Sequence, residues 1–407
     1  MSPIRNASAE RRLHEASPEA FTGPVKGAAP SRWSNAWLEI DAAVFEQNIG
    51  KLREHLGAGI EICATMKADA YHHGIELLMP SILRMGIQAV GVCSNAEGLR
   101  VRRSGFKGRL LRLRAASVPE MVEGFVLDFE EIMGNVQVAQ ALGAAARLRG
   151  APARIHLALN SGQMGRSDIE MQTECGRNQA LTILKMRGLR PAGIMTHYAL
   201  EEPAVLQHQA GDFLADAQWL VQAAGLLRES IVLHSANSNA LMEVAQTHFD
   251  MVRPGRVLYG YSRHAQFQRL MTFKSRVTAV NEYRADTGVT YHHTYRLGRA
   301  SRLANIPVGY ADSHRKQYTG GDVLIRGHRV PIVGAITMNS LMVDVTDFPD
   351  IGSGDEVVLY GRQDGDAISG EEIQRYIHES MVEMTTRWSV NPKVLASAAP
   401  AAWRWRV

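Results

Sequence analysis

The sequence predicts an N-terminal (β/α)8 TIM-like barrel followed by a mostly antiparallel β domain. Short apolar runs alternate with helical patterns at intervals of roughly twenty to forty residues, which is typical of parallel βαβ units. About eight such units in some two hundred residues favour a closed barrel. After about Leu270 the apolar runs follow one another with Gly, Pro and Asp turns between them, which indicates antiparallel strands.

The barrel domain is predicted over residues 31–268. It starts with a strand over Trp37–Ile40 and a helix capped by Asp41. The other predicted strands are a run that ends at Lys67, Ala89–Cys93, Leu110–Leu113, Glu130–Met133, Ile155–Leu159, Leu189–Met195 and Ile231–His234. Helical patterns cover Gly74–Met85, Val136–Leu148 and Val205–Ala224. An open doubly wound sheet is the alternative, although the G-x-G-x-x-G fingerprint of its dinucleotide-binding version is missing.

The β domain is predicted over residues 269–407. Its expected strands are Val277–Val280, Ala304–Val308, Val323–Ile325, Val330–Ile336, Leu341–Val345 and Glu356–Tyr360. One amphipathic helix near Gly370–Ser380 follows them. Residues 1–30, rich in Ala, Pro, Ser, Gly and charged residues, are expected to be a flexible extension.

Composition excludes several classes of protein. The 407 residues carry a formal net charge of +4 with the basic residues scattered, so we expect no nucleic-acid partner. No apolar run is long enough to span a membrane. Residues 1–30 lack the apolar core of a secretory signal, which favours a cytoplasmic protein, although a periplasmic form whose signal was removed would look the same. The three cysteines lack metal-ligand spacing, so no metal site is expected.

Polar side chains follow the predicted strands where each strand ends. They are Lys67 after the second strand, Asn160 and Arg166 after Ile155–Leu159, His197 after Leu189–Met195, Asn237 and Ser238 after Ile231–His234, and Arg253 and Gly255 before Val257–Tyr259. Functional groups of a barrel collect at the carboxyl ends of its strands, so these groups are expected to lie together. Each also has a structural interpretation: a lysine that extends into water, a core histidine, or a helix cap.

This set of groups suggests a cofactor. A reactive lysine near hydroxyl and glycine amide donors is what pyridoxal phosphate needs, with the lysine as its Schiff-base partner. Ser238 at a helix start and the Gly255 turn can supply the phosphate donors. Aldolases that form Schiff bases also use a barrel lysine, so Lys67 alone does not select the cofactor.

Seven segments resemble, in order, the signatures of the alanine racemase family. They are Lys67–Gly74 (KADAYHHG), Met195–Tyr198, Ala236–Ser238, Met251–Gly255, Gly288–Tyr291, Val308–Asp312 and Met338–Asp344. The resemblance covers about Trp37–Val394. It implies a pyridoxal-phosphate enzyme that acts as a head-to-tail homodimer, with each active site between the barrel of one subunit and the β domain of the other.

The resemblance also implies a role for each site residue. Lys67 holds the cofactor and acts as acid and base on one face of the substrate Cα, and Tyr291 from the other subunit acts on the opposite face. Tyr295 is a nearby alternative, but the spacing after Gly288 favours Tyr291. Arg166 is expected to hold Tyr291 in its ionisable state and to meet the substrate carboxylate.

The remaining implied roles concern the cofactor and the substrate. Arg253 donates to the pyridine nitrogen, supported by Asn237, which makes the ring a poorer electron sink and favours racemisation over transamination. His197 lies against the ring, and Tyr71, Ser238 and Gly255 surround the phosphate. Tyr310 lines the entrance, the Met338 amide receives the substrate carboxylate, and Asn339 lies beside the substrate.

Some segments depart from the usual family pattern. Ala158–Arg166 lacks the lysine that supports the arginine, Asn339 replaces an aspartate, and Arg387–Lys393 is distinctive. All three resemble the broad-specificity amino-acid racemase branch, which implies free Lys, Arg, Met or Gln as substrates besides Ala. His72 stands at a usual glycine, so it either strains the turn or adopts the left-handed conformation. Ser313 and His314 replace a Gly-Tyr pair and are expected near the entrance.

A disulfide is not expected. The broad-specificity branch is typically periplasmic and tends to pair two cysteines, of which Cys63 resembles the first, while Ala89 stands at the second position. Cys93 lies four residues further along the strand, roughly 13 Å away, which is beyond disulfide reach if residue 89 lies beside residue 63.

Other functions on the same scaffold remain open: an alanine-specific racemase, a pyridoxal-phosphate decarboxylase or D-amino-acid lyase, and a non-catalytic pyridoxal-phosphate carrier.

Overall fold

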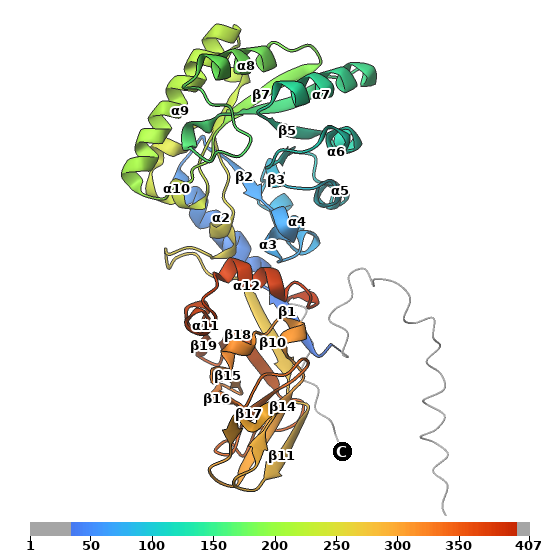
Figure 1. Cartoon of the computed structure of the whole chain (residues 1–407), viewed down its shortest axis with the longest axis vertical. Helices are drawn as coiled ribbons and strands as arrows, with labels where there is room; N and C mark the ends of the chain where they lie inside the picture. The colour runs from blue at the N-terminus through green and yellow to red at the C-terminus, as the bar shows by residue number, and fades with distance from the viewer. Residues whose placement is uncertain (1–33, 397–407) are drawn as a thin grey trace, which may run out of the picture.

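Eight parallel strands close into a barrel, as predicted. The computed structural model describes residues 34–396, and Figure 1 shows the barrel at one end of an elongated molecule and the β domain at the other. The barrel strands are β2 (Glu61–Thr65), β3 (Ala89–Val92), β4 (Arg109–Arg112), β5 (Phe129–Met133), β6 (Ala153–Ala158), β7 (Leu189–Met195), β8 (Val232–His234) and β9 (Met251–Val252). The strand β9 was not predicted, and the apolar run Val257–Tyr259 forms part of a 3-10 turn after it.

Helices cover the outside of the barrel. They are α2 (Ala42–Leu56), α4 (Ile75–Arg84), α5 (Asn95–Arg103), α6 (Val118–Glu123), α7 (Val136–Arg149), α8 (Glu174–Leu184), α9 (Pro203–Ala224) and α10 (Ser238–Glu243). The segment α3 (Lys67–Tyr71) that follows β2 is a left-handed turn. Asp41 caps α2 by accepting the amides of Ala43 and Val44. Between residues 34 and 396 no helix has the length and apolar character needed to cross a bilayer.

The β domain is built on one large, mostly antiparallel sheet. Its strands are β1 (Ala36–Ile40), β10 (Met271–Arg276), β11 (Ala279–Tyr283), β14 (Ser301–Ile306), β15 (Asp322–Ile325), β16 (His328–Val333), β17 (Leu341–Asp344), β18 (Glu356–Gln363), β19 (Asp366–Ile368) and β20 (Lys393–Leu395). A separate pair, β12 (Gly288–Val289) and β13 (Tyr295–Arg296), carries a loop between its strands. Two helices, α11 (Gly370–Ile377) and α12 (Met381–Trp388), complete the domain.

Three elements differ from the sequence prediction. The strand β1 lies in the β domain, paired with β10 and β20, although its residues fall in the range predicted for the barrel. The strand predicted over Val277–Val280 is interrupted, because Val277 links the end of β10 to the start of β11 and bonds with the loop at 354–355. The helix predicted near Gly370–Ser380 ends at Ile377, and Ser380 starts a second helix, α12, through a capping box with Glu383.

The cysteines are all free, as predicted. Cys63 on β2 pairs in register with Ala89 on β3, so residue 89 lies beside residue 63. Cys93 follows the end of β3 and is not bonded to Cys63 or Cys175. The predicted extension over residues 1–30 lies outside the described residues.

His314 does not lie at an entrance. It is 3% exposed and packs in the β domain between the rings of Phe273 and Tyr318, with centroid distances of 6.3 and 5.3 Å. Its Nε2 has no hydrogen-bond partner in the described structure. Burial lowers the pKa of His314 to about 4, so the ring is neutral in the folded protein. The expected position of His314 near the entrance is therefore wrong.

Replacing His314 with Phe should change the pH dependence of stability. Between pH 6.5 and 4 the unfolded chain binds a proton at His314 that the folded chain does not, so the native state loses stability as the pH falls. His314→Phe removes this loss. Its free energy of unfolding relative to wild type should rise by about 2 kcal/mol between pH 8 and pH 5, measured by denaturant titrations.

The exposed His208 provides the control, because His208→Gln should show no such difference. An equal effect of His314→Phe at both pH values would contradict the prediction.

Candidate active site

Lys67 lies at the carboxyl end of β2, at the start of a left-handed turn. The five residues Ala68–His72 all have positive φ angles, between 51° and 65°. A left-handed conformation costs about 1–2 kcal/mol per non-glycine residue, so the turn must be held by its surroundings. His72, at the usual glycine position, takes φ 65° and ψ 18° and ends the turn in the left-handed conformation.

Asp69 ties this turn to both domains. Its side chain accepts the Ile75 amide at 2.9 Å and forms ion pairs with Arg100 at 2.6 Å and with Lys393 at 3.2 Å. Burial raises the pKa of Asp69, but the hydrogen bond from the Ile75 amide and the charges of Lys393 and Arg100 lower it by more. Because Lys393 belongs to β20, the β domain helps to fix the turn that carries Lys67.

One cavity of about 450 Å³ gathers the polar residues that follow the barrel strands, except Asn160. The Asn160 side chain instead donates to Glu170 and accepts the Gly165 amide, each at 2.9 Å. Its lining includes Lys67, Tyr71, Arg166, His197, Asn237, Ser238, Arg253 and Gly255. The Lys67 amine forms no hydrogen bond or ion pair within residues 34–396, and it lies 6.0 Å from the centroid of the Tyr71 ring. Lys67, Arg166 and Arg253 make the cavity cationic, which suits an anionic ligand.

Arg253 is buried at the floor of the cavity. Its guanidinium donates to the backbone carbonyls of Thr196 at 2.8 Å and Ser235 at 2.9 Å, and contacts the ring nitrogen Nδ1 of His234 at 2.6 Å. These groups support Arg253, in place of the side chain of Asn237 that was predicted to do so. The Asn237 side chain caps α10 by accepting the amides of Asn239 and Ala240.

His197 and Tyr71 keep their neutral forms. Burial, aided by the positive charge of Arg253, lowers the pKa of His197 to about 3. Burial raises the pKa of Tyr71 to about 12. Tyr71 stacks on Tyr259 at 4.9 Å between centroids, and this stacking fixes the direction of its hydroxyl. A neutral imidazole and a phenol donor suit an aromatic ligand with an anionic group.

Ser238 and Gly255 lie together at one end of the cavity. The Ser238 hydroxyl accepts the amides of Gly255 at 2.8 Å and Val257 at 3.3 Å, so its own proton is available to a ligand. A Cβ at residue 255 would lie 2.4 Å from the Tyr71 hydroxyl oxygen. Only glycine therefore lets Tyr71 approach this backbone.

Four predicted site residues lie elsewhere. Tyr291 is 67% exposed in the loop between β12 and β13, and Tyr310, Met338 and Asn339 follow β14 or precede β17. The Tyr310 amide bonds to the Thr337 carbonyl, so the loops of Tyr310 and Met338 lie together. None of the four lines the cavity of their own chain.

The sequence analysis missed several residues of the site. The cavity is also lined by Leu113, Ile132, Met195, Arg256 and Val382. Leu113, Ile132 and Met195 lie at the ends of predicted strands, but their apolar side chains gave no chemical signal. His234, the last residue of β8, could have been found as a polar residue at the end of an apolar run.

Comparisons with known proteins agree with this architecture. The description "Alanine racemase, N-terminal domain" matches residues 40–263, and "Alanine racemase, C-terminal domain" matches residues 270–395. The chain belongs to the alanine racemase family.

Members of the racemase family resemble the chain over nearly their whole length. It is 48% identical to a broad specificity amino-acid racemase from Pseudomonas taetrolens, covering 89% of this chain and 90% of that protein. It is 37% identical to a lysine racemase from Proteus mirabilis, covering 91% and 92%. The fold matches that of alanine racemase from Bartonella henselae with covalently bound pyridoxal phosphate, with a TM-score of 0.73, 22% identity, and coverage of 88% of this chain and 99% of that chain.

The Gly255 cradle gives a test of the binding site. Gly255→Ala should push Tyr71 out of place, because the stacked ring cannot retreat, and should weaken binding of pyridoxal phosphate to the apoprotein about tenfold or more. The dissociation constant can be measured from the absorption of the bound cofactor.

Gly211→Ala on α9 is the matched control, since a Cβ there meets nothing within 4 Å. Equal affinities for the Gly255→Ala and Gly211→Ala proteins would contradict a role of the Gly255 turn in binding the cofactor.

Proposed function

We propose that this protein is a pyridoxal-phosphate-dependent amino-acid racemase of broad specificity that works as a homodimer with shared active sites. The observation that carries the proposal is the single cavity in which Lys67, Arg253, Ser238 and Gly255 meet. These residues fit pyridoxal phosphate: an unpaired amine, a ring-nitrogen donor and a phosphate cradle. When bound, the cofactor draws electron density from the substrate and makes its Cα proton easier to remove.

Racemisation needs a proton to leave one face of Cα and to return on the other. Lys67 moves the proton on one face. Tyr291 does not line the cavity of its own chain and is exposed in the loop between β12 and β13. The proposal therefore gives the second face to Tyr291 of the partner subunit, in a symmetric dimer whose subunits complete each other's sites.

The substrates are proposed to be free amino acids with side chains longer than methyl. The named relatives are a broad specificity amino-acid racemase and a lysine racemase. A second cavity of about 280 Å³ shares Leu113, Ile132, Arg166 and Met195 with the first, which leaves room for a side chain beyond Cα. Lys, Arg, Met and Gln are the candidates besides Ala.

Incubation in D2O distinguishes racemisation from the alternative reactions. With L-lysine, L-arginine or L-alanine, the enzyme should produce the D-enantiomer with deuterium at Cα, measured by chiral chromatography and mass spectrometry. Lys67→Ala should abolish formation of the D-enantiomer and exchange of deuterium into Cα, because no base remains on that face. Release of CO2 or ammonia without the D-enantiomer would instead indicate a decarboxylase or lyase.

Tyr291→Phe should lower racemisation by about 10²- to 10⁴-fold, the usual contribution of a positioned acid or base. One enantiomer should still exchange its Cα proton without inversion, because Lys67 remains. Tyr295→Phe, four residues away in β13, is the control and should retain activity.

Mixing the two inactive homodimers tests whether the site is shared. A heterodimer of Lys67→Ala and Tyr291→Phe chains has one intact site only if Lys67 and Tyr291 come from different subunits. After exchange of subunits, about a quarter of wild-type activity should return. No recovery, with heterodimers present, would contradict a shared site.

A further inference from the structure

A chain of buried hydrogen bonds runs from Arg253 through the interior of the barrel. His234 Nδ1 lies 2.6 Å from Arg253 Nη1, and His234 Nε2 lies 2.7 Å from His156 Nδ1. His156 Nε2 in turn lies 2.8 Å from Glu130 Oε2. His156 and His234 have no exposed surface, and Glu130 is 3% exposed. The chain joins β8, β6 and β5, which are not all neighbours in the sheet, so it crosses the barrel core.

The chemistry of arginine fixes the direction of every bond in this chain. Arginine can only donate, so His234 Nδ1 must accept and its proton must lie on Nε2. His156 Nδ1 then accepts a hydrogen bond from His234 Nε2, and His156 Nε2 donates a hydrogen bond to the Glu130 carboxylate. Burial lowers the pKa of both histidines, which keeps them neutral. The negative charge of Glu130 therefore polarises each donor back to Arg253.

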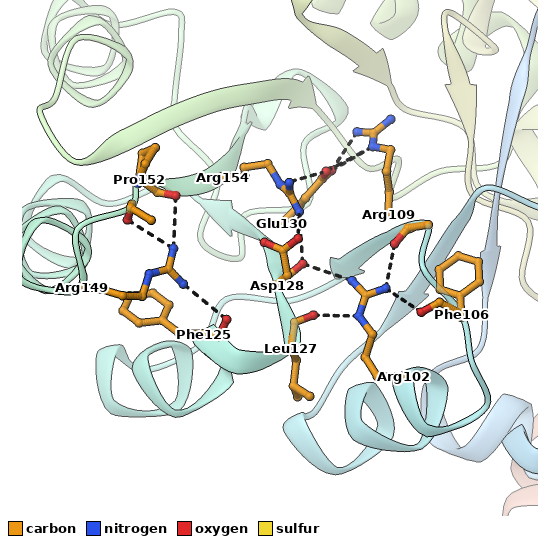
Figure 2. Close-up of polar contacts among 12 residues, drawn as sticks. Arg102, Phe106, Arg109, Phe125, Leu127, Asp128, Glu130, Arg149, Pro152 and Arg154 are labelled. Atoms are coloured by element: carbon orange, nitrogen blue, oxygen red, sulfur yellow. Dashed lines mark hydrogen bonds and ion pairs between the residues drawn. The ribbon is translucent and has the colours of Figure 1, made fainter.

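The far end of this chain of hydrogen bonds, at Glu130, is held at the amino-terminal end of the barrel. Arg109 donates to Glu130 at 2.8 Å, and Arg154 lies 3.4 Å from its other oxygen, as Figure 2 shows. Burial alone would raise the pKa of Glu130, but hydrogen bonds from His156 and Arg109 lower it to about 2. The Glu130 carboxyl group is therefore ionised in the folded protein.

The barrel makes space for this chain. A Cβ on Gly193 of β7 would lie 2.3 Å from His156 Nδ1, so only glycine at that position allows the two histidine rings to meet.

We propose that Glu130 is a positioning residue for the cofactor: through His156 and His234 it fixes the orientation of Arg253 and the strength with which Arg253 donates to the cofactor ring nitrogen. The proposal rests on the proposed function, because it takes Arg253 as the ring-nitrogen donor. A carboxylate at the opposite end of the barrel then tunes a group that it does not touch.

The test compares two neighbouring glutamates of β5. Glu130→Gln keeps the shape of the side chain but removes its charge. Glu131→Gln is the matched control, since Glu131 is equally buried and pairs with the buried Arg112 at 2.8 Å outside the chain to Arg253. The readouts are the dissociation constant of pyridoxal phosphate and the pH titration of its absorption when bound.

Glu130→Gln should weaken cofactor binding about tenfold, as loss of a residue that orients a ligand typically does. It should also shift the midpoint of the absorption titration by at least about 0.5 pH units. His156→Phe should reproduce these changes, and the double variant should add little, because both act through one chain. Similar changes in Glu131→Gln, or none in folded Glu130→Gln, would overturn the proposal.

A measurement on the wild-type apoprotein keeps the test independent of folding of the variants. Nitrogen-15 NMR of labelled histidine should show His156 and His234 neutral, each with its proton on Nε2. A proton on Nδ1 of either ring would overturn the proposal. Failure of the wild-type protein to bind pyridoxal phosphate would contradict the proposed function instead.

Discussion

The buried guanidinium of Arg253 is the charge on which the carboxyl end of the barrel depends. Removing an ion from water is costly unless its hydrogen bonds are replaced. The carbonyls of Thr196 and Ser235, at the ends of β7 and β8, and the ring of His234 replace them. The same positive charge disfavours protonation of His197. Arg253 thus organises the carbonyls at the ends of β7 and β8 and favours the neutral form of the His197 ring.

Much of the fold was predictable, because parallel and antiparallel strands have different sequence patterns. Seven of the eight barrel strands lie close to their predicted bounds. The misplacement of β1 has a physical cause: periodicity indicates a strand but not its partner. The apolar run Trp37–Ile40 was recognised as a strand, whereas its pairing with β10, more than two hundred residues away, leaves no local signal. The start of α12 did have a sequence signal, the capping box formed by Ser380 and Glu383.

The candidate site was predictable where chemistry lies at strand ends. Most of the polar residues after the barrel strands line one cavity because all parallel strands end on the same face. The role of Asn237 was not predictable, since a helix cap and a hydrogen bond to Arg253 require the same residue type. His156 and Glu130 lie within strands, where side chains that face the barrel interior cannot be distinguished from those that face the helices without a structure.

The position of β1 between β10 and β20 affects how the protein can be made. The whole barrel is inserted between the first strand of the β domain and the rest of that domain. At a synthesis rate of about 5–20 residues per second, β1 leaves the ribosome roughly 12 to 46 seconds before β10 is made. The barrel can close during that interval, while the apolar β1 waits without a partner. Cotranslational folding should therefore be ordered, with the barrel first and the β domain completed only when the C-terminal strand β20 is released.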